Sequence, residues 1–146
     1  EVTKLDEVRV FNSGIVLDGR TQSVKDAYAH DITVAMGTDA SCPFSTQTGM
    51  WREVVYFARL GGFGVKAALY AATMGGAAAV GQADKTGSLE AGKRADILLL
   101  SDDPVSYPET LRTPVAVVAG GRLVAHPKPK RNKKIESVLD GLMKEL

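Results

Sequence analysis

The stretch Ile32-Thr33-Val34-Ala35-Met36-Gly37-Thr38-Asp39-Ala40 determines the fold that the sequence predicts. Its apolar, β-branched part, residues 32–36, stops at a glycine and leads to Asp39. This pattern predicts a buried strand with a carboxylate at its C-terminal end, which is the end that carries the chemistry in α/β folds. The alternative interpretation is that Asp39 only caps a turn, because aspartate is common in turns and caps.

A helix is expected on the N-terminal side of this strand, with Thr21 or Ser23 as its cap. Three side chains share one face of it at i, i+3, i+4 spacing: Val24, Ala27 and Tyr28. Helix followed by strand is the order of a βα repeat unit. Further upstream, residues 1–20 are expected to form one or two short strands around the turn signal at 12–14.

On the C-terminal side of the strand, a polar loop precedes a run of helical patterns. The loop, residues 41–48, lies over the strand end, where loops often bind ligands. Helices are expected over 50–60, 65–72 and 74–80, each followed by glycine or a capping residue, with Thr73 as the cap of the last. The second of these helices is rich in alanine, so it can approach its neighbours closely.

The pattern changes to β structure in the second half of the chain. A glycine-punctuated turn over 86–94 leads to a strand candidate over 95–100. Residues 114–119 and 122–125 are expected to form a hairpin, because Gly120-Gly121 supplies the positive φ that a two-residue turn needs.

Residues 127–146 are predicted to be a basic linker followed by an amphipathic C-terminal helix that docks on the body or on a partner. One apolar stripe marks this helix: Ile135, Val138, Leu139, Leu142 and Leu146. The basic side chains are not interleaved with aromatic ones, so no nucleic-acid partner is expected.

The composition fits an ordinary globular domain. Of 146 residues, 45% are hydrophobic, and 18 basic side chains nearly balance 17 acidic ones. A formal net charge of +1 gives no overall attraction to nucleic acid or acidic lipid. No run approaches the roughly 18 apolar residues of a membrane span, so no membrane partner is expected. The single cysteine, Cys42, cannot form an internal disulfide, which agrees with a cytoplasmic location.

Three segments, taken together, resemble the C-terminal part of the amidohydrolase superfamily, in the branch with imidazolonepropionase-like and prolidase-like enzymes. They are Val34-Ala35-Met36-Gly37-Thr38-Asp39-Ala40, the helical Ala71-Ala72-Thr73-Met74-Gly75-Gly76-Ala77-Ala78-Ala79-Val80-Gly81, and Thr86-Gly87-Ser88-Leu89-Glu90-Ala91-Gly92-Lys93-Arg94-Ala95-Asp96-Ile97-Leu98-Leu99-Leu100 with Asp103-Pro104 close behind. The resemblance implies an α/β fold, namely the C-terminal part of a (β/α)8 metal-dependent hydrolase barrel plus part of the accompanying β-sandwich. Residues 1–84 are then the last βα units of an incomplete barrel, and residues 85–126 the sandwich hairpin region.

In that family the corresponding aspartate ends the eighth barrel strand, binds a catalytic divalent metal, usually zinc, and takes a proton from the metal-bound water. The resemblance assigns both the catalytic and the metal-binding role to Asp39. The chemistry is reasonable, because a metal lowers the pKa of its water to near neutrality and an adjacent carboxylate can receive the proton as hydroxide attacks a carbonyl. The implied reaction is hydrolysis of a C–N bond in a small-molecule amide, lactam or dipeptide.

The family's other ligands have no counterpart in this sequence. They are a His-x-His pair on the first strand, often a carboxylated lysine on the fourth, and histidines on the fifth and sixth. His30 and His126 lack the spacing of a zinc site. A complete barrel also needs about 200–250 residues. We therefore expect this chain alone to bind no metal and to be inactive, and to need the missing barrel portion or self-association. Its first residue, Glu1, favours a fragment or a processed product.

A non-catalytic interaction or structural module derived from that family is the alternative. Cys42 follows Asp39 closely, but a reactive thiolate needs a histidine, a cation or a helix N-terminus beside it, so we expect Cys42 to be inert or merely adjacent to the substrate. Thr38, Ser41 and Pro43 would shape the substrate pocket of a completed barrel.

Overall fold

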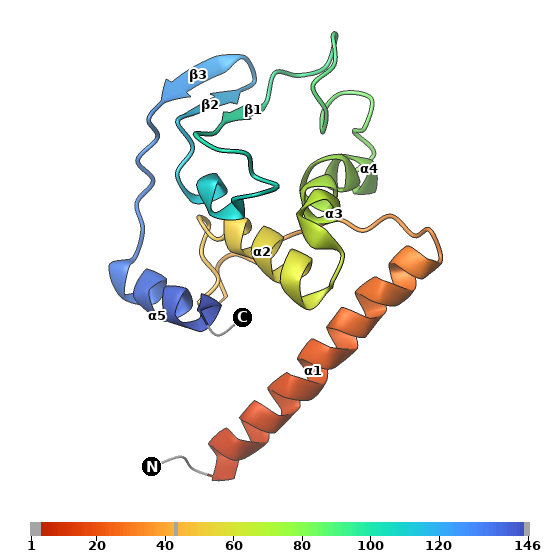
Figure 1. Cartoon of the computed structure of the whole chain (residues 1–146), viewed down its shortest axis with the longest axis vertical. Helices are drawn as coiled ribbons and strands as arrows, with labels where there is room; N and C mark the ends of the chain where they lie inside the picture. The colour runs from red at the N-terminus through yellow and green to blue at the C-terminus, as the bar shows by residue number, and fades with distance from the viewer. Residues whose placement is uncertain (1–3, 43, 145–146) are drawn as a thin grey trace.

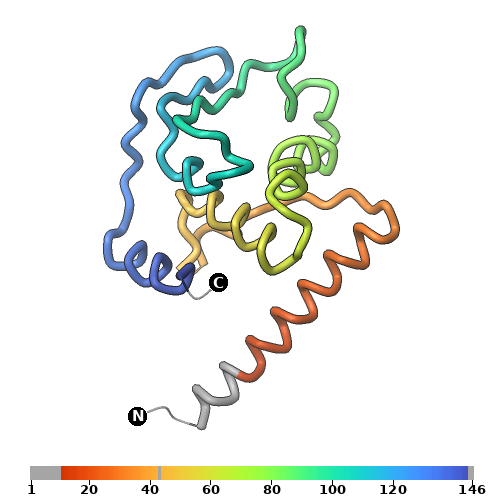
Figure 2. The backbone as a smooth tube through the Cα atoms, viewed as in Figure 1, coloured from red at the N-terminus to blue at the C-terminus, as the bar shows by residue number. Residues whose placement is uncertain are grey.

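The computed structural model describes residues 4–42 and 44–144, and side chains from residue 11 onward. Figure 2 shows the path of the backbone. Helix α1 (Lys4–Ala29) projects from a body that holds the remaining helices and a small sheet (Figure 1). The body consists of α2 (Met50–Leu60), α3 (Gly64–Tyr70), α4 (Gly76–Ala79), β1 (Ile97–Leu99), β2 (Ala116–Ala119), β3 (Arg122–Ala125) and α5 (Lys133–Met143), in that order along the chain. Within the described part of the chain, no helix combines the length and the apolar character needed to cross a membrane.

The expected strands over residues 1–20 are wrong for the described residues 4–20. Helix α1 continues without a break through the turn signal at 12–14. A lone strand leaves its backbone N–H and C=O groups unpaired, whereas a helix pairs them within the same segment. Thr21 and Ser23 therefore lie inside the helix rather than at its cap, and the Ser23 hydroxyl donates to the carbonyl of Gly19 at 2.8 Å.

The contact face predicted near the end of α1 is confirmed. Val24, Ala27 and Tyr28 are all partly buried. The Tyr28 ring stacks on Phe63 with centroids 4.5 Å apart and meets the edge of Phe57 at 6.2 Å. Such aromatic contacts attach this end of α1 to the body.

The buried strand predicted over 32–36 is extended but neither paired nor buried. Ile32 is 60% exposed. Residues alternate between exposed and partly covered along 33–38, and the amide of Met36 donates to the carbonyl of Ala71 at 3.2 Å. A parallel strand needs a hydrogen-bonded neighbouring strand. The described residues provide none beside this segment, because the only sheet they form is β1–β2–β3, and so the prediction of a buried strand is wrong for this chain.

The predicted helix over 50–60 is confirmed as α2, which supplies more of the core than any other element. Its buried apolar residues share one face at helical spacing: Trp51, Val54, Val55 and Ala58. They form two clusters, one with Met143 of α5 and one with Ala68 of α3. Leu111, in the 3-10 helix Pro108–Arg112, packs against both clusters.

Helices α3 and α4 are joined by a π-helical turn, Ala71–Gly75, into one helical path. Thr73 is therefore not a cap, and its hydroxyl donates instead to the carbonyl of Leu69 at 2.7 Å. The close approach predicted from the alanines is confirmed, because Ala68 and Ala71 are 0% exposed. A β carbon at Gly75 would lie 2.3 Å from the carbonyl oxygen of Val34, so only glycine allows the helix to sit this close to segment 32–38.

The sheet is a three-stranded antiparallel meander in the order β1-β2-β3. The predicted hairpin is confirmed, with φ of 54° at Gly120 and 82° at Gly121. The first strand is shorter than predicted, Ile97–Leu99. The Asp96 carboxylate accepts a hydrogen bond from the amide of Gly120 at 2.7 Å, which ties the start of β1 to the hairpin turn.

Helix α5 docks on the body, but through a face that includes only part of the predicted stripe, of which Ile135 and Leu139 are partly buried. Its buried residues are Glu136 and Met143. Two members of the predicted stripe, Val138 and Leu142, are 45% and 52% exposed. Leu146 lies outside the described residues. The polar face docks because it meets the buried side chain of Arg52 and the partly buried side chain of Arg112, as described below.

Candidate functional site

Asp39 lies at the C-terminal end of segment 32–38, as the sequence predicts, and begins the loop that leads to α2. Its side chain is exposed. Its φ of 49° is in the left-handed region, which aspartate tolerates better than most residues. Ser41 and Phe44 in the same loop also have positive φ, 93° and 63°. Backbone conformations of this kind persist only where surrounding contacts hold them.

Hydrogen bonds within the loop fold it back on the end of the segment. The Ser45 hydroxyl donates to the carbonyl of Thr38. The Ser41 amide donates to the carbonyl of Ser45 at 3.3 Å, and the Ser45 amide to that of Cys42 at 3.0 Å. The loop thus holds the carboxylate of Asp39 at a defined, solvent-open position.

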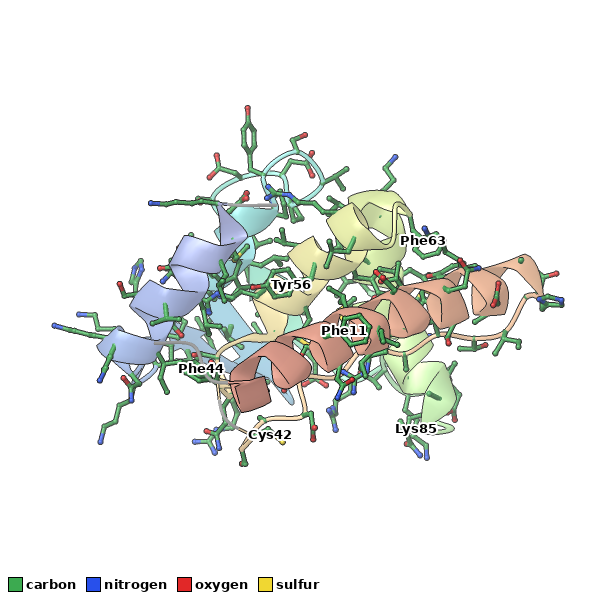
Figure 3. The ribbon with its side chains drawn as sticks, turned by 90° about the horizontal axis from the view of Figure 1, so that it is seen from below. Phe11, Cys42, Phe44, Tyr56, Phe63 and Lys85 are labelled. Carbon is green, nitrogen blue, oxygen red and sulfur yellow. The ribbon has the colours of Figure 1, made fainter. Side chains whose placement is uncertain are left out.

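Cys42 is brought directly to Asp39. The Cys42 Sγ donates to Asp39 Oδ2 at 3.4 Å (Cys42 is labelled in Figure 3). This hydrogen bond, together with the negative charge of Asp39, raises the pKa of the Cys42 thiol above its usual value. The thiol is therefore kept protonated, and the geometry supports the expectation that Cys42 is not a nucleophile.

The remaining predicted site residues do not join Asp39. His30 ends α1, where its Nδ1 lies 2.8 Å from the carbonyl oxygen of Asp26. His126 follows β3, and its amide donates to the carbonyl of Val115. Pro43 lies outside the described residues.

These residues do not fit a complete metal site. Among the described residues, no group of three or more histidine, cysteine, aspartate or glutamate side chains lies close enough together to hold a metal ion. Catalytic zinc typically takes three protein ligands, whereas Asp39 and Cys42 provide one carboxylate and one protonated thiol.

A small cavity of about 40 Å³ lies beside the loop. Thr38 from the end of the segment, Arg52 and Tyr56 from α2, and Leu139 from α5 all line it. Tyr56 lies on α2, between α5 and α1 in the view of Figure 3. The C-terminal helix α5 therefore lines the cavity beside the Asp39 loop.

Below this cavity lies a buried ion network. Arg52 is 2% exposed, and its Nη2 donates to Glu136 Oε2 at 3.0 Å and to Asp140 Oδ1 at 2.5 Å. Arg112 donates to the same two carboxylates at 3.1 Å and 2.9 Å. Both guanidinium groups also lie over the ring of Trp51, at 4.6 Å and 5.2 Å from its centroid.

The network sets the charge state of its carboxylates. Burial raises the pKa of Glu136, but the hydrogen bond from Arg52 and the charges of Arg52, Arg112 and Arg131 outweigh it, so that the pKa lies below its ordinary value. The pKa of Asp140 is lowered in the same way, by Arg52 and Arg112 against the effect of burial. Both groups are therefore ionised at neutral pH.

The sequence reasoning missed this network. One signal was available: Arg52 occupies the buried side of a predicted amphipathic helix, and a buried arginine needs a carboxylate partner. Glu136 and Asp140 are four residues apart on the last predicted helix and are thus on one face.

The comparison with protein families decides the affiliation of the chain. The model of the Amidohydrolase family matches residues 4–126. The chain belongs to the amidohydrolase family. The resemblance found in the sequence motifs is thereby confirmed.

Individual amidohydrolase relatives are much longer than this chain. An imidazolonepropionase from Syntrophobacter fumaroxidans is 40% identical over 95 residues, which are 60% of this chain and 22% of that protein. The crystal structure of a proposed prolidase from Bifidobacterium longum superimposes on 97% of this chain with a TM-score of 0.87 and 34% identity, over 34% of its own length. A Xaa-Pro dipeptidase with bound methionine matches 72% of this chain with a TM-score of 0.60 and 31% identity, over 25% of its length.

This chain therefore spans between a fifth and about a third of these relatives. The superpositions support a partial α/β fold with a small three-stranded sheet. The (β/α)8 barrel and the β-sandwich, and the division at residues 84 and 126, stay predictions.

Proposed function

We propose that this chain is the C-terminal portion of a metal-dependent amidohydrolase that cleaves a C–N bond in a small-molecule amide, lactam or dipeptide. Family membership and the names of the relatives, an imidazolonepropionase and a Xaa-Pro dipeptidase, support hydrolysis of such bonds. The observation that carries the proposal is the position of Asp39, an exposed carboxylate at the end of the extended segment within the matched region.

Asp39 has the chemical features of a proton acceptor. Its carboxylate is open to solvent and touches only a weak donor, the thiol of Cys42, among the hydrogen-bond partners found in the described residues. A carboxylate so placed can take a proton from water as that water attacks a carbonyl carbon. Because the described residues do not make a metal site, the other ligands of a divalent metal, which we propose to be zinc, would come from protein outside them.

The chain alone is proposed to be inactive. Segment 32–38 has no neighbouring strand among the described residues, and Ile32 at its start is 60% exposed. The missing barrel portion, from the same or another polypeptide, or a second copy of the chain would cover this edge.

Complementation tests the proposal. The chain is mixed with the part of the Bifidobacterium longum protein that precedes its matching third, zinc is added, and hydrolysis of Xaa-Pro dipeptides and simple lactams is followed. We expect activity only in the mixture, and a loss of at least about a hundredfold in Asp39→Asn with assembly unchanged in size-exclusion chromatography. Hydrolysis by the chain alone, or an active Asp39→Asn mixture, would contradict the proposal.

A non-catalytic interaction module is the second candidate, and the exposed side chains of α1 favour it. Phe11 is 69% exposed and Ile15 is 56% exposed. Exposed apolar groups gathered on one element are typical of a surface that contacts another protein. If this candidate is correct, the mixture assembles without any hydrolysis.

A further inference from the structure

The loop that carries Asp39 needs support from outside itself. Asp39, Ser41 and Phe44 all have φ between 49° and 93°. Backbone conformations of this kind are unfavourable for residues other than glycine and persist only where surrounding contacts hold them. The hydrogen bonds within the loop alone join neighbours only a few residues apart, so they do not fix the loop relative to the body.

Helix α5 meets the loop through one hydrogen bond and through a cavity that both line. The Thr48 hydroxyl donates to Glu136 Oε1 at 3.5 Å, across 88 residues of sequence. Thr46 and Thr48 are linked through their hydroxyls at 3.3 Å, which extends this contact toward Ser45. Leu139 of α5 and Thr38, the residue before Asp39, line the same 40 Å³ cavity.

An ion network, in addition to the apolar contact of Met143, fixes α5 in this position. Glu136 is 5% exposed and bonds to Arg52, whose own amide donates to the carbonyl of Gly49 at the end of the loop, at 2.8 Å. The apolar residues Val138 and Leu142 face outward. A shift of α5 would leave the buried guanidinium of Arg52 without its partners, which is strongly unfavourable.

We propose that α5 is a brace that sets the position of the Asp39 loop, with Glu136 and Thr48 as positioning residues. Glu136 lies on α5, and its carboxylate accepts hydrogen bonds from Arg52 of α2 and from Thr48 of the loop. The functional meaning of the brace rests on the proposed role of Asp39. The effect of α5 on the position of the loop does not depend on that role. This effect can be measured without metal, substrate or a partner chain.

Hydrogen exchange of the intact chain, followed by mass spectrometry over peptides that cover 38–49, tests the brace. Emission of Trp51, the single tryptophan, which touches the network, reports separately on the docking of α5. In Glu136→Gln we expect exchange of 38–49 to become about tenfold faster. Glu90→Gln, which removes a 60% exposed carboxylate that pairs with Lys93, is the matched control and should leave 38–49 unchanged.

Thr48→Val separates positioning from general stability, because it cuts the contact to the loop and leaves the ion network intact. We expect faster exchange over 38–49 with Trp51 emission and helical circular dichroism as in the wild type. In the double variant the two effects should be less than additive, since both act through one contact. Unchanged exchange over 38–49 in Thr48→Val, or strictly additive effects, would overturn the proposal. Because no activity is measured, this outcome is independent of the complementation result.

Discussion

The buried guanidinium of Arg52 balances the negative charge of two carboxylates. Its side chain is 2% exposed and bonds to Glu136 and Asp140. Removing one partner of a buried ion pair typically costs about 3–5 kcal/mol. Arg112 still pairs with both carboxylates when Arg52 is replaced, so this range is an upper bound here. We expect Arg52→Met to lower the free energy of unfolding by up to about this amount, measured by urea titration with far-UV circular dichroism.

Arg59 on the same helix is the control. It pairs with Glu109 at 3.4 Å, and the two side chains are 44% and 54% exposed. Exposed pairs contribute about 0–1 kcal/mol, so Arg59→Met should have a small effect. Equal losses in the two variants would show that the network adds nothing to stability beyond ordinary surface charge.

The same network predicts a loss of stability in acid. The pKa values of Glu136 and Asp140 are lowered in the folded chain by the arginines that face them, against the effect of burial. In the unfolded chain these carboxyl groups have a pKa of about 4. A carboxyl group whose pKa is lower in the folded chain stabilises the fold at pH values above the unfolded pKa. This stabilisation is lost as the pH falls through the folded pKa. We expect the free energy of unfolding to decrease as the pH falls from about 5 to about 3.

Other carboxylates contribute to this acid response. The pKa of Asp96 is lowered mainly by the Gly120 amide, and that of Asp103 by the Val105 amide. The contribution of the network is therefore the difference between wild type and Glu136→Gln in pH-dependent urea titrations. If the free energy of unfolding depended on pH in the same way in the wild type and in Glu136→Gln, the network would not contribute to the loss of stability in acid.

The place of Asp39 could be predicted from the sequence, but its surroundings could not. An apolar run followed by glycine and aspartate is a local pattern, and the structure confirms that Asp39 ends an extended segment. The bond between Arg52 and Glu136 joins residues 84 positions apart. Nothing near Arg52 in the sequence indicates which of the chain's carboxylates it meets.

The contact between the α3–α4 path and segment 32–38 depends on one glycine. A β carbon at Gly75 would lie 2.3 Å from the Val34 carbonyl oxygen, whereas one at Gly76 would meet nothing closer than 3.8 Å. We expect Gly75→Ala to lower the free energy of unfolding by about 1–3 kcal/mol, because backbone must move. Gly76→Ala should raise it by about 0.4–1 kcal/mol by restricting the unfolded chain. Thermal unfolding of both variants measures these changes. If Gly75→Ala did not lower the free energy of unfolding, the helix and segment 32–38 would not be in this contact.

Helices were more predictable than strands because their hydrogen bonds are local. The spacing of Trp51, Val54, Val55 and Ala58 is sufficient to predict α2 and its buried face. Segment 32–38 has strand-like residues, yet pairing depends on a neighbour that the described residues do not contain. Helix α5 was predicted correctly as a helix, but the periodicity of its apolar residues did not reveal that a carboxylate face would dock.

The molecule as a whole leaves a large apolar surface open where α1 meets the body. A groove of about 630 Å³ runs between α1, α2 and α5. It is lined mainly by apolar side chains, among them Leu17, Val24, Met36, Phe57, Leu60 and Leu142. Apolar grooves with few polar groups are typical of surfaces that contact another protein, so we expect the chain alone to cover this groove by association.

Self-association can be tested at two exposed apolar residues of α1 that lie outside this groove. Phe11 is 69% and Ile15 is 56% exposed on the projecting helix (Figure 1). In sedimentation velocity we expect the weight-average sedimentation coefficient of the wild-type chain to rise with concentration, and Phe11→Lys/Ile15→Lys to suppress this rise because charge on the surface opposes its burial. Leu89→Lys is the control, since Leu89 is 75% exposed on a distant turn. If the double variant and the control associate equally, or if the wild type stays monomeric at every concentration, the apolar surface of α1 does not mediate contact between copies, and a different polypeptide is needed to cover it.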